Sequence, residues 1–142
     1  MAPDPKKPHV NCILLVDDDL AGNAFHIITI KNSGICNHIK TASNGRKALD
    51  YIIRSEEEAE AFPKPDLIYL DINMPAMNGF EFLDEYKKLV EKLSKHSVII
   101  MLTTSLNPED KKRALETKEV TEFQNKPLTE DILSQTIQKY FG

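Results

Sequence analysis

The sequence predicts an α/β protein in which parallel strands form an open sheet with helices on both faces. Short, uninterrupted apolar runs occupy residues 12–16, 67–70 and 98–102. Runs of this length, rich in Ile, Leu and Val, are typical of strands buried on both faces. Segments with apolar residues at helical spacing separate these runs. The 142 residues suffice for one domain of ordinary size.

Two weaker strands, at residues 37–42 and 120–124, fit the edges of the sheet. The first helix is expected over residues 20–32, where apolar side chains recur at positions 20, 24, 27 and 28. Positions 48, 49, 52 and 53 form the apolar stripe of the second helix, and positions 82, 86, 89, 90 and 93 that of the third. Asn107 and Pro108 begin the fourth helix, and Thr129 begins the fifth. Strict alternation of strand and helix indicates a parallel sheet.

Composition and charge exclude several classes of protein. With 41% hydrophobic residues the chain is too apolar to be disordered, and its net charge of −4 argues against a general nucleic-acid-binding module. No apolar run approaches the ~20 residues of a membrane span, so we expect no membrane partner. Cys12 and Cys36 are too few for a disulfide framework and are interpreted as reduced thiols of a cytoplasmic protein.

The first residues contain three prolines and no apolar segment of the secretory type. We therefore expect residues 1–10 to be a flexible tail and residues 11–142 to be the single domain.

Polar side chains follow the strands at the points where ligands bind in open parallel sheets, outside the carboxyl ends of the strands. The ends of the first, third, fourth and fifth strands contribute to this set, which comprises Asp17, Asp18, Asp19, Asp71, Asn73, Thr103, Thr104, Ser105, Lys126 and Pro127. Each alone is also typical of a capped helix start or a turn. Their occurrence after the correct strands predicts one shared site.

The chemistry of this set points to a magnesium-dependent phosphoryl group acceptor. Three carboxylates in one cleft are stable as anions only beside cations, and Mg²⁺ prefers carboxylate oxygens. Asp17, Asp18 and Asp71 contribute −3, which Mg²⁺ and Lys126 balance. A carboxylate can then act as a nucleophile and form an aspartyl phosphate.

Four segments resemble the receiver domains of bacterial two-component response regulators: residues 13–19, 70–79, 101–105 and 125–128. Residues 44–49 resemble the start of that family's second helix. The resemblance covers about residues 11–140 and is closest to stand-alone receivers of the chemotaxis type. It implies a flavodoxin-like fold with strand order 2-1-3-4-5.

The resemblance also implies roles for single residues. Asp71 is the expected phosphoacceptor. Asp18 and Asp71 are the expected side-chain ligands of Mg²⁺, and Asp17 lies beside them and is expected to contact the ion through a water molecule. The backbone carbonyl of Asn73 is a further expected ligand. Lys126 is expected to contact the phosphoryl oxygens.

The remaining implied roles concern switching. Thr103 is expected to hydrogen-bond the phosphoryl group and move with it. Phe123 occupies the aromatic switch position, where some relatives carry tyrosine. A cis peptide bond is implied before Pro127.

These residues together predict a phosphorylation-driven switch. A sensor histidine kinase or a histidine phosphotransfer protein is the expected phosphate donor. The expected output is a changed face formed by the fourth helix, fifth strand and fifth helix, which a downstream protein recognises. The segment 108–119 is highly charged, which indicates a lightly anchored fourth helix. We expect a monomer or weak homodimer.

Three alternatives remain at this point. The protein could relay phosphate onward to a histidine phosphotransfer protein. It could be a phosphatase with an aspartyl-phosphate intermediate, although such enzymes place a second carboxylate where this chain has Asn73. It could also be a docking module that needs no phosphate, against which the acidic residues, Thr103 and Lys126 argue.

Overall fold

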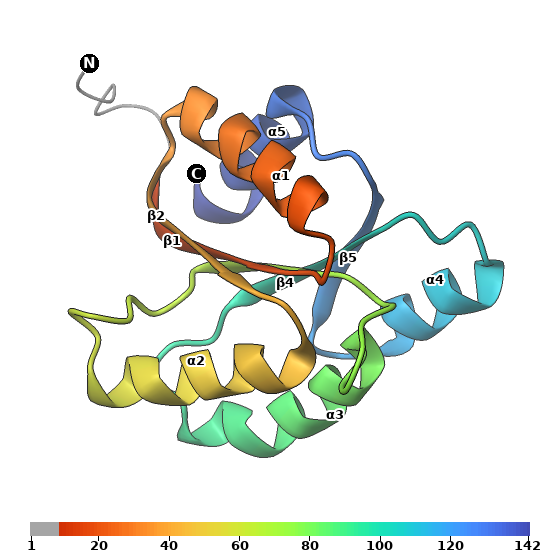
Figure 1. Ribbon diagram of the computed structural model, residues 1–142, viewed down its shortest axis with the longest axis horizontal. Helices are drawn as coiled ribbons and strands as arrows, with labels where there is room; N and C mark the ends of the chain where they lie inside the picture. Colours follow the sequence, from red (N-terminus) through yellow and green to blue (C-terminus); the bar gives the residue numbers. More distant parts are fainter. Residues whose placement is uncertain (1–8) are drawn as a thin grey trace.

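A computed structural model describes residues 9–142 of the chain as a five-stranded parallel sheet between two helical layers (Figure 1). The strands are β1 (Val10–Val16), β2 (Cys36–Ala42), β3 (Leu67–Leu70), β4 (Val98–Thr103) and β5 (Val120–Asn125), in the order β2-β1-β3-β4-β5. The helices are α1 (Leu20–Ser33), α2 (Gly45–Glu57), α3 (Gly79–Leu89), α4 (Pro108–Glu116) and α5 (Glu130–Phe141). The predicted α/β fold and its strand order are confirmed.

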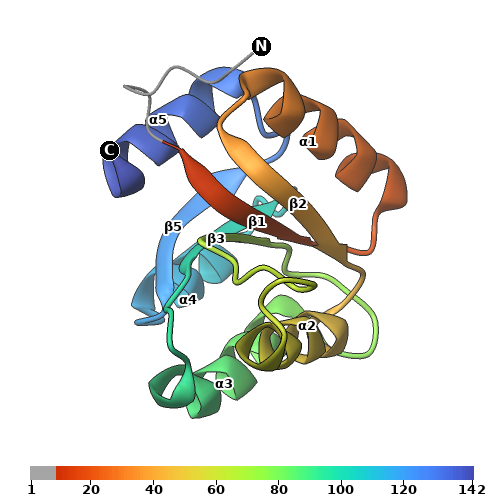
Figure 2. The same cartoon turned by 90° about the vertical axis from the view of Figure 1, so that its left-hand side faces the viewer.

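The alternating side chains of the central strands divide the core into two halves. Helices α1 and α5 cover one face of the sheet, and α2, α3 and α4 cover the other (Figure 2). Leu14, Val16 and Leu70 point into the half beneath α2 and α3, whereas Ile13 and Leu15 point into the half beneath α1 and α5. Because side chains of a strand alternate between faces, a continuous apolar run can fill both halves at once.

The strand register brings the carboxyl ends of β1, β3 and β4 to one edge of the sheet. Val16 pairs with Leu70, and Leu70 pairs with Met101. The residues that follow β1 and β3, Asp17 and Asp71, are therefore neighbours. Their backbones are fixed by the sheet, since the Asp71 amide donates to the Val16 carbonyl oxygen at 2.9 Å.

Most strand and helix boundaries lie within one or two residues of the prediction, and two of the differences change the assignment of a residue. Val10 is the first residue of β1 and is 3% exposed, so the domain begins before residue 11. Residues 1–8 of the expected tail lie outside the described residues. Helix α3 ends at Leu89 and continues as the 3₁₀ turn η1 (Val90–Lys92), so Leu93 lies beyond the helix to which its spacing assigned it.

The predicted apolar face of the first helix is wrong. Leu20 and Ile28 are 78% and 58% exposed, whereas Asn23 and His26 are buried. The polar side chains turn inward because each has a backbone partner in the loops at the sheet edge: Asn23 Nδ2 donates to the Asp17 carbonyl oxygen at 2.9 Å, and His26 Nε2 accepts from the Leu128 amide at 3.3 Å. Hydrogen-bonded polar groups can occupy a core position, although the Asn23 Oδ1 atom is buried without a hydrogen-bond partner.

Cys12 and Cys36 are both free thiols, as predicted. Among the helices of the described residues, none combines the length and apolar character needed to cross a membrane.

Candidate phosphoacceptor site

Three carboxylates meet at the edge of the sheet where β1 and β3 end. Oxygens of Asp17, Asp18 and Asp71 all lie within 4.8 Å of one another. Asp17 and Asp71 are only 5% and 8% exposed, whereas Asp18 is exposed. The sheet register places Asp17 beside Asp71, and Asp18 follows in the β1–α1 loop. The structure thus forms a half-buried acidic cleft from residues of two separate strands.

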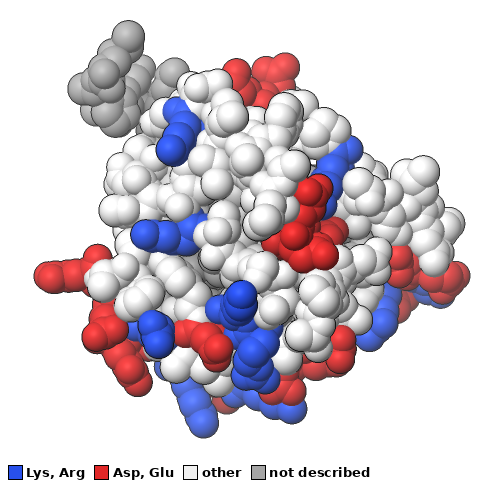
Figure 3. Space-filling view, in the orientation of Figure 1, with Lys and Arg blue, Asp and Glu red and all other residues white. Residues whose placement is uncertain are grey.

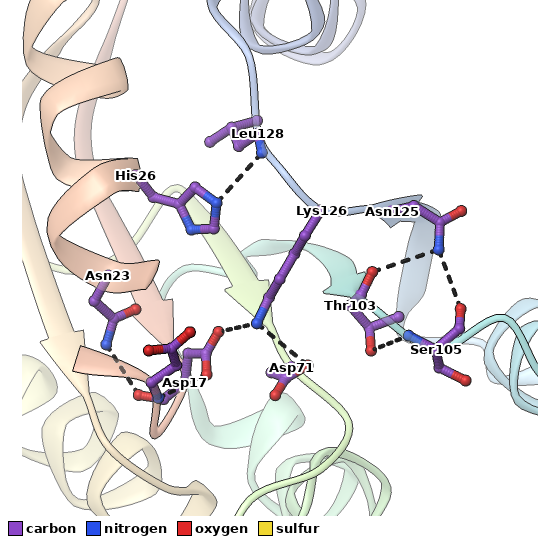
Figure 4. Close-up of polar contacts among 10 residues, drawn as sticks. Asp17, Asn23, His26, Asp71, Thr103, Ser105, Asn125, Lys126 and Leu128 are labelled. Atoms are coloured by element: carbon purple, nitrogen blue, oxygen red, sulfur yellow. Dashed lines mark hydrogen bonds and ion pairs between the residues drawn. The ribbon is translucent and has the colours of Figure 1, made fainter. Parts of the chain in front are cut away.

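Lys126 reaches into this cleft from the loop after β5 (Figure 4). Its Nζ contacts a carboxylate oxygen of Asp17 and lies 3.8 Å from Asp71 Oδ1. Burial by itself lowers the pKa of Lys126, but the hydrogen bond to Asp17 and the charge of Asp71 outweigh burial and raise it. The lysine therefore stays cationic and holds the two buried carboxylates together.

Asp71 has an unusually high pKa for a carboxyl group. Burial and the charge of Asp17 raise its pKa to about 6, against the opposing effect of Lys126. A carboxylate poised in this way is ionised at neutral pH. Burial and the charge of Asp17 disfavour the negative charge of Asp71, which favours its contact with a cation.

Thr103 links the cleft to the start of α4. It is 1% exposed at the end of β4, and its Oγ1 accepts a hydrogen bond from the Ser105 amide at 3.1 Å. Ser105 Oγ in turn donates to Asp110 Oδ2 of α4 at 2.6 Å. Asn125 Nδ2 donates to the carbonyl oxygens of Thr103 and Ser105 at 3.4 and 3.1 Å, as Figure 4 shows.

The loop after Asp71 requires glycine at position 79. A Cβ on Gly79 would lie 2.4 Å from the Asp71 carbonyl oxygen, and the Gly79 amide donates to the Ile72 carbonyl oxygen at 2.9 Å. Asn78 caps α3 in a reciprocal capping box with Glu81. This close approach of backbones fixes the loop that carries Asp71.

The fold agrees with that of known proteins. The model of the response regulator receiver domain family matches residues 13–138, which is most of the chain. The chain belongs to the response regulator receiver family.

Several relatives of this receiver domain are of similar length. The response regulator Rcp1 of Synechocystis is 33% identical over 78% of this chain and 71% of its own length. A probable methanogenesis regulatory protein, FilR2, of Methanothrix harundinacea is 30% identical over 89% of this chain and 79% of its own. A two-component response regulator from Cytophaga hutchinsonii has a TM-score of 0.80 and is 29% identical, with 93% of this chain and 97% of that chain covered.

The acidic cleft of this receiver domain fits a divalent cation. Receiver domains bind a divalent metal at an acidic pocket, and here three carboxylates offer hard oxygen ligands at mutual distances that one ion can span. A solved Mn²⁺-bound form of Rcp1 has a TM-score of 0.67 and is 30% identical, with 91% of this chain and 90% of that chain covered.

The other predicted site residues lie around the cleft at different depths. Asn73 is exposed in the β3–α3 loop, and its side chain is not part of the carboxylate cluster. Phe123, on β5, is half-buried and packs against the core beneath α2 and α3. The Lys126–Pro127 peptide bond is cis.

The sequence analysis did not predict two residues of α1 that hydrogen-bond the backbone beside the acidic cleft. Asn23 and His26 of α1 are buried and hold, respectively, the Asp17 carbonyl and the backbone two residues after Lys126. Burial lowers the pKa of His26, and Lys126 nearby lowers it further, so the imidazole is neutral and can accept the hydrogen bond. No pattern within α1 marks these two residues, because the backbone groups that they meet belong to other elements.

Proposed function

We propose that this receiver domain is a phosphorylation switch in which Asp71 accepts a phosphoryl group from the phosphohistidine of a sensor histidine kinase or a histidine phosphotransfer protein. The observation that carries the proposal is the shared cleft. The Asp71 carboxylate lies within 4.8 Å of ligand oxygens of Asp17 and Asp18 and 3.8 Å from Lys126 Nζ. An acceptor carboxylate, a cation-binding acidic pair and an ammonium group are the components that phosphoryl transfer to aspartate requires.

The transfer is a displacement at phosphorus. A carboxylate oxygen of Asp71 forms the new O–P bond while the N–P bond of phosphohistidine breaks and its electron pair returns to the imidazole nitrogen. Asp17, Asp18 and Asp71 would hold Mg²⁺, which supplies charge neutralisation on the transferring oxygens when bound. Lys126 is free to turn from Asp17 to a phosphoryl oxygen, because a bound cation satisfies Asp17.

The residue two positions after Asp71 favours a persistent phosphoryl group over rapid turnover. Asn73 is exposed and carries an amide, which cannot act as a general base for an attacking water. This argues for a signal and against a phosphatase.

We assign the docking surface for the phosphate donor to the outer face of α1. Leu20, Phe25 and Ile28 are 78%, 52% and 58% exposed along this face. In Figure 3 the surface over α1 is mostly uncharged, with acidic side chains at the end next to the cleft. Exposed apolar side chains clustered beside a reactive group mark an interaction surface, and helices of a partner can cover such a stripe.

The output follows from the connection between Thr103 and α4. A phosphoryl group on Asp71 offers new acceptors to the Thr103 hydroxyl. Thr103 and Ser105 are hydrogen-bonded to each other, and Ser105 is bonded to Asp110 of α4. Movement of Thr103 therefore changes the α4–β5–α5 face, where Phe123 repacks and a downstream protein binds.

The test is incubation with Mg²⁺ and acetyl phosphate, followed by intact-mass measurement. We expect a stable gain of one phosphoryl group that is absent in Asp71→Ala and in the presence of EDTA. Rapid turnover of acetyl phosphate without accumulation would instead indicate a phosphatase. Metal binding without any modification would indicate a docking module.

A second arm tests the docking face. Phe25→Ala should slow phosphoryl transfer from a phosphohistidine protein about tenfold or more and leave acetyl phosphate transfer unchanged. Leu115→Ala removes an equally exposed apolar side chain from α4, which is 55% exposed, and is the matched control. Equal slowing by both variants would refute α1 as the docking face.

A further inference from the structure

A cavity outside the acidic cleft lies between the end of β2, helix α2 and the loop that follows α2. Its volume is about 720 Å³, within the range of small-molecule sites. Tyr51 and Phe62 form an aromatic wall, with ring centroids 5.8 Å apart in an edge-to-face arrangement. The Tyr51 hydroxyl donates to the Pro63 carbonyl oxygen at 2.7 Å, which fixes the orientation of the ring.

Two cationic side chains line the cavity. Lys47 and Arg54 both line it, and within residues 9–142 neither forms an ion pair. The Arg54 guanidinium lies over the Phe62 ring at 5.4 Å from its centroid, which keeps the charge at the aromatic wall. Figure 3 shows blue side chains over α2 on this side of the molecule, with red side chains among them.

One carboxylate lies between the two cations along the helix. Asp50 lines the cavity one turn from Lys47 and one turn from Arg54. Ser43, in the loop after β2, adds a hydroxyl. The cavity therefore offers an aromatic surface, two cationic groups and an acceptor for N–H or O–H donors.

We propose that this cavity binds a nucleoside phosphate. The base would stack against Phe62 and Tyr51, the phosphate would contact Lys47 and Arg54, and Asp50 would accept hydrogen bonds from ribose hydroxyls or an amino group. A plain anion leaves the aromatic wall unused and meets repulsion from Asp50. A neutral aromatic ligand leaves both cations without a partner. Only a ligand that combines a ring, donors and an anionic group uses every feature.

This site is separate from the proposed phosphoacceptor and does not depend on it. The experiment is an amide-shift NMR titration of the full chain with adenosine and guanosine 5′-monophosphates. EDTA is present throughout, because nucleotides could otherwise reach the acidic cleft as metal complexes. Asp71→Ala protein is titrated in parallel to exclude binding at that cleft.

We expect saturable shifts centred on Ser43, Lys47, Arg54 and Phe62, unchanged in Asp71→Ala. Arg54→Gln and Phe62→Ala should each weaken binding about tenfold, through loss of a charged contact and of stacking. Lys92→Gln removes an exposed cation from η1, outside the cavity, and is the matched control that should bind normally.

Four results would overturn the proposal. If neither nucleotide gives saturable shifts, nucleoside phosphates are excluded as ligands of the cavity. Equally tight binding of inorganic phosphate or of adenosine shows that the combined chemistry is not recognised. Binding that survives both Arg54→Gln and Phe62→Ala places the ligand elsewhere. If an acidic aromatic peptide shifts the amide signals of the cavity residues and neither nucleotide does, the cavity binds a protein partner instead.

Discussion

At the scale of single residues, Asp71 is held in a state that costs the folded protein free energy. Burial and the neighbouring Asp17 oppose its charge, and Lys126 compensates only in part. A residue under such opposing influences is typical of a functional site, since a purely structural position favours a neutral side chain. The cost is removed by whatever neutralises Asp71: a proton, a metal ion or a substitution.

Replacement of Asp71 by asparagine should therefore stabilise the metal-free protein. The folded-state pKa of about 6 lies above the ordinary 3.8, so the native state binds the proton more tightly than the unfolded state. Wild-type protein thus gains stability relative to Asp71→Asn as pH falls from 7 toward 4. We expect Asp71→Asn to be about 2–3 kcal/mol more stable at pH 7 and less than about 1 kcal/mol more stable at pH 4.

Urea unfolding in EDTA at the two pH values measures this difference. Asp18→Asn, at the exposed position of the same cleft, is the matched control and should shift stability less. A variant at position 71 that is no more stable than wild type at pH 7 would show that Asp71 is not under electrostatic strain.

At the scale of elements, α4 has fewer buried residues than any other α-helix of the described residues. Only Ala114 of its nine residues is buried. A second anchor is the Arg113 guanidinium, which lies 4.1 Å from the Phe80 ring centroid of α3. Few buried apolar groups imply a low free energy of local opening, which suits an element that must change position.

Arg113→Ala should loosen α4 without unfolding the domain. Cation–π contacts at partly exposed sites contribute roughly 0.5–1 kcal/mol, so global stability should fall by about that amount. Amide hydrogen exchange within residues 108–116 should accelerate selectively. Lys112→Ala, at a neighbouring exposed position, should leave exchange in α4 nearly unchanged. Uniform acceleration over the whole chain would mean that α4 does not open independently.

Helix α1 is an element whose buried face cannot be predicted from its own sequence pattern. Apolar spacing predicts that the helix exists, but it does not predict which face of the helix is buried. Asn23 and His26 point inward because the Asp17 carbonyl and the Leu128 amide are there to meet them. Both partners belong to other elements, so no periodicity within residues 20–33 could reveal them.

At the scale of the whole molecule, the acidic cleft was predictable and the α2 cavity was not. The cleft follows from a general rule, because parallel strands deliver the residues after β1, β3, β4 and β5 to one edge. The cavity depends on how Phe62, in an irregular loop, folds against Tyr51 and Arg54. Loop conformation has no period, and its contacts arise only in the tertiary structure.

The cleft also couples the metal to the stability of the entire domain. Asp18 and Asp71 are 53 residues apart in the sequence (71 − 18), so their carboxylates meet only when β1 and β3 are paired. A cation that needs both binds the folded state alone and stabilises it by mass action. At a Mg²⁺ concentration of about 100 times its dissociation constant, unfolding should cost about 2.7 kcal/mol more.

Thermal or urea unfolding with Mg²⁺, and again after EDTA addition, measures this linkage. KCl at matched ionic strength should stabilise the protein much less, because screening alone does not relieve the repulsion among buried carboxylates. Asp18→Asn should weaken the Mg²⁺ effect, since it removes one ligand while Asp17 and Asp71 keep their contacts with Lys126. Equal stabilisation of wild type and Asp18→Asn would place the ion outside the cleft and remove the basis for Mg²⁺-dependent phosphorylation of Asp71.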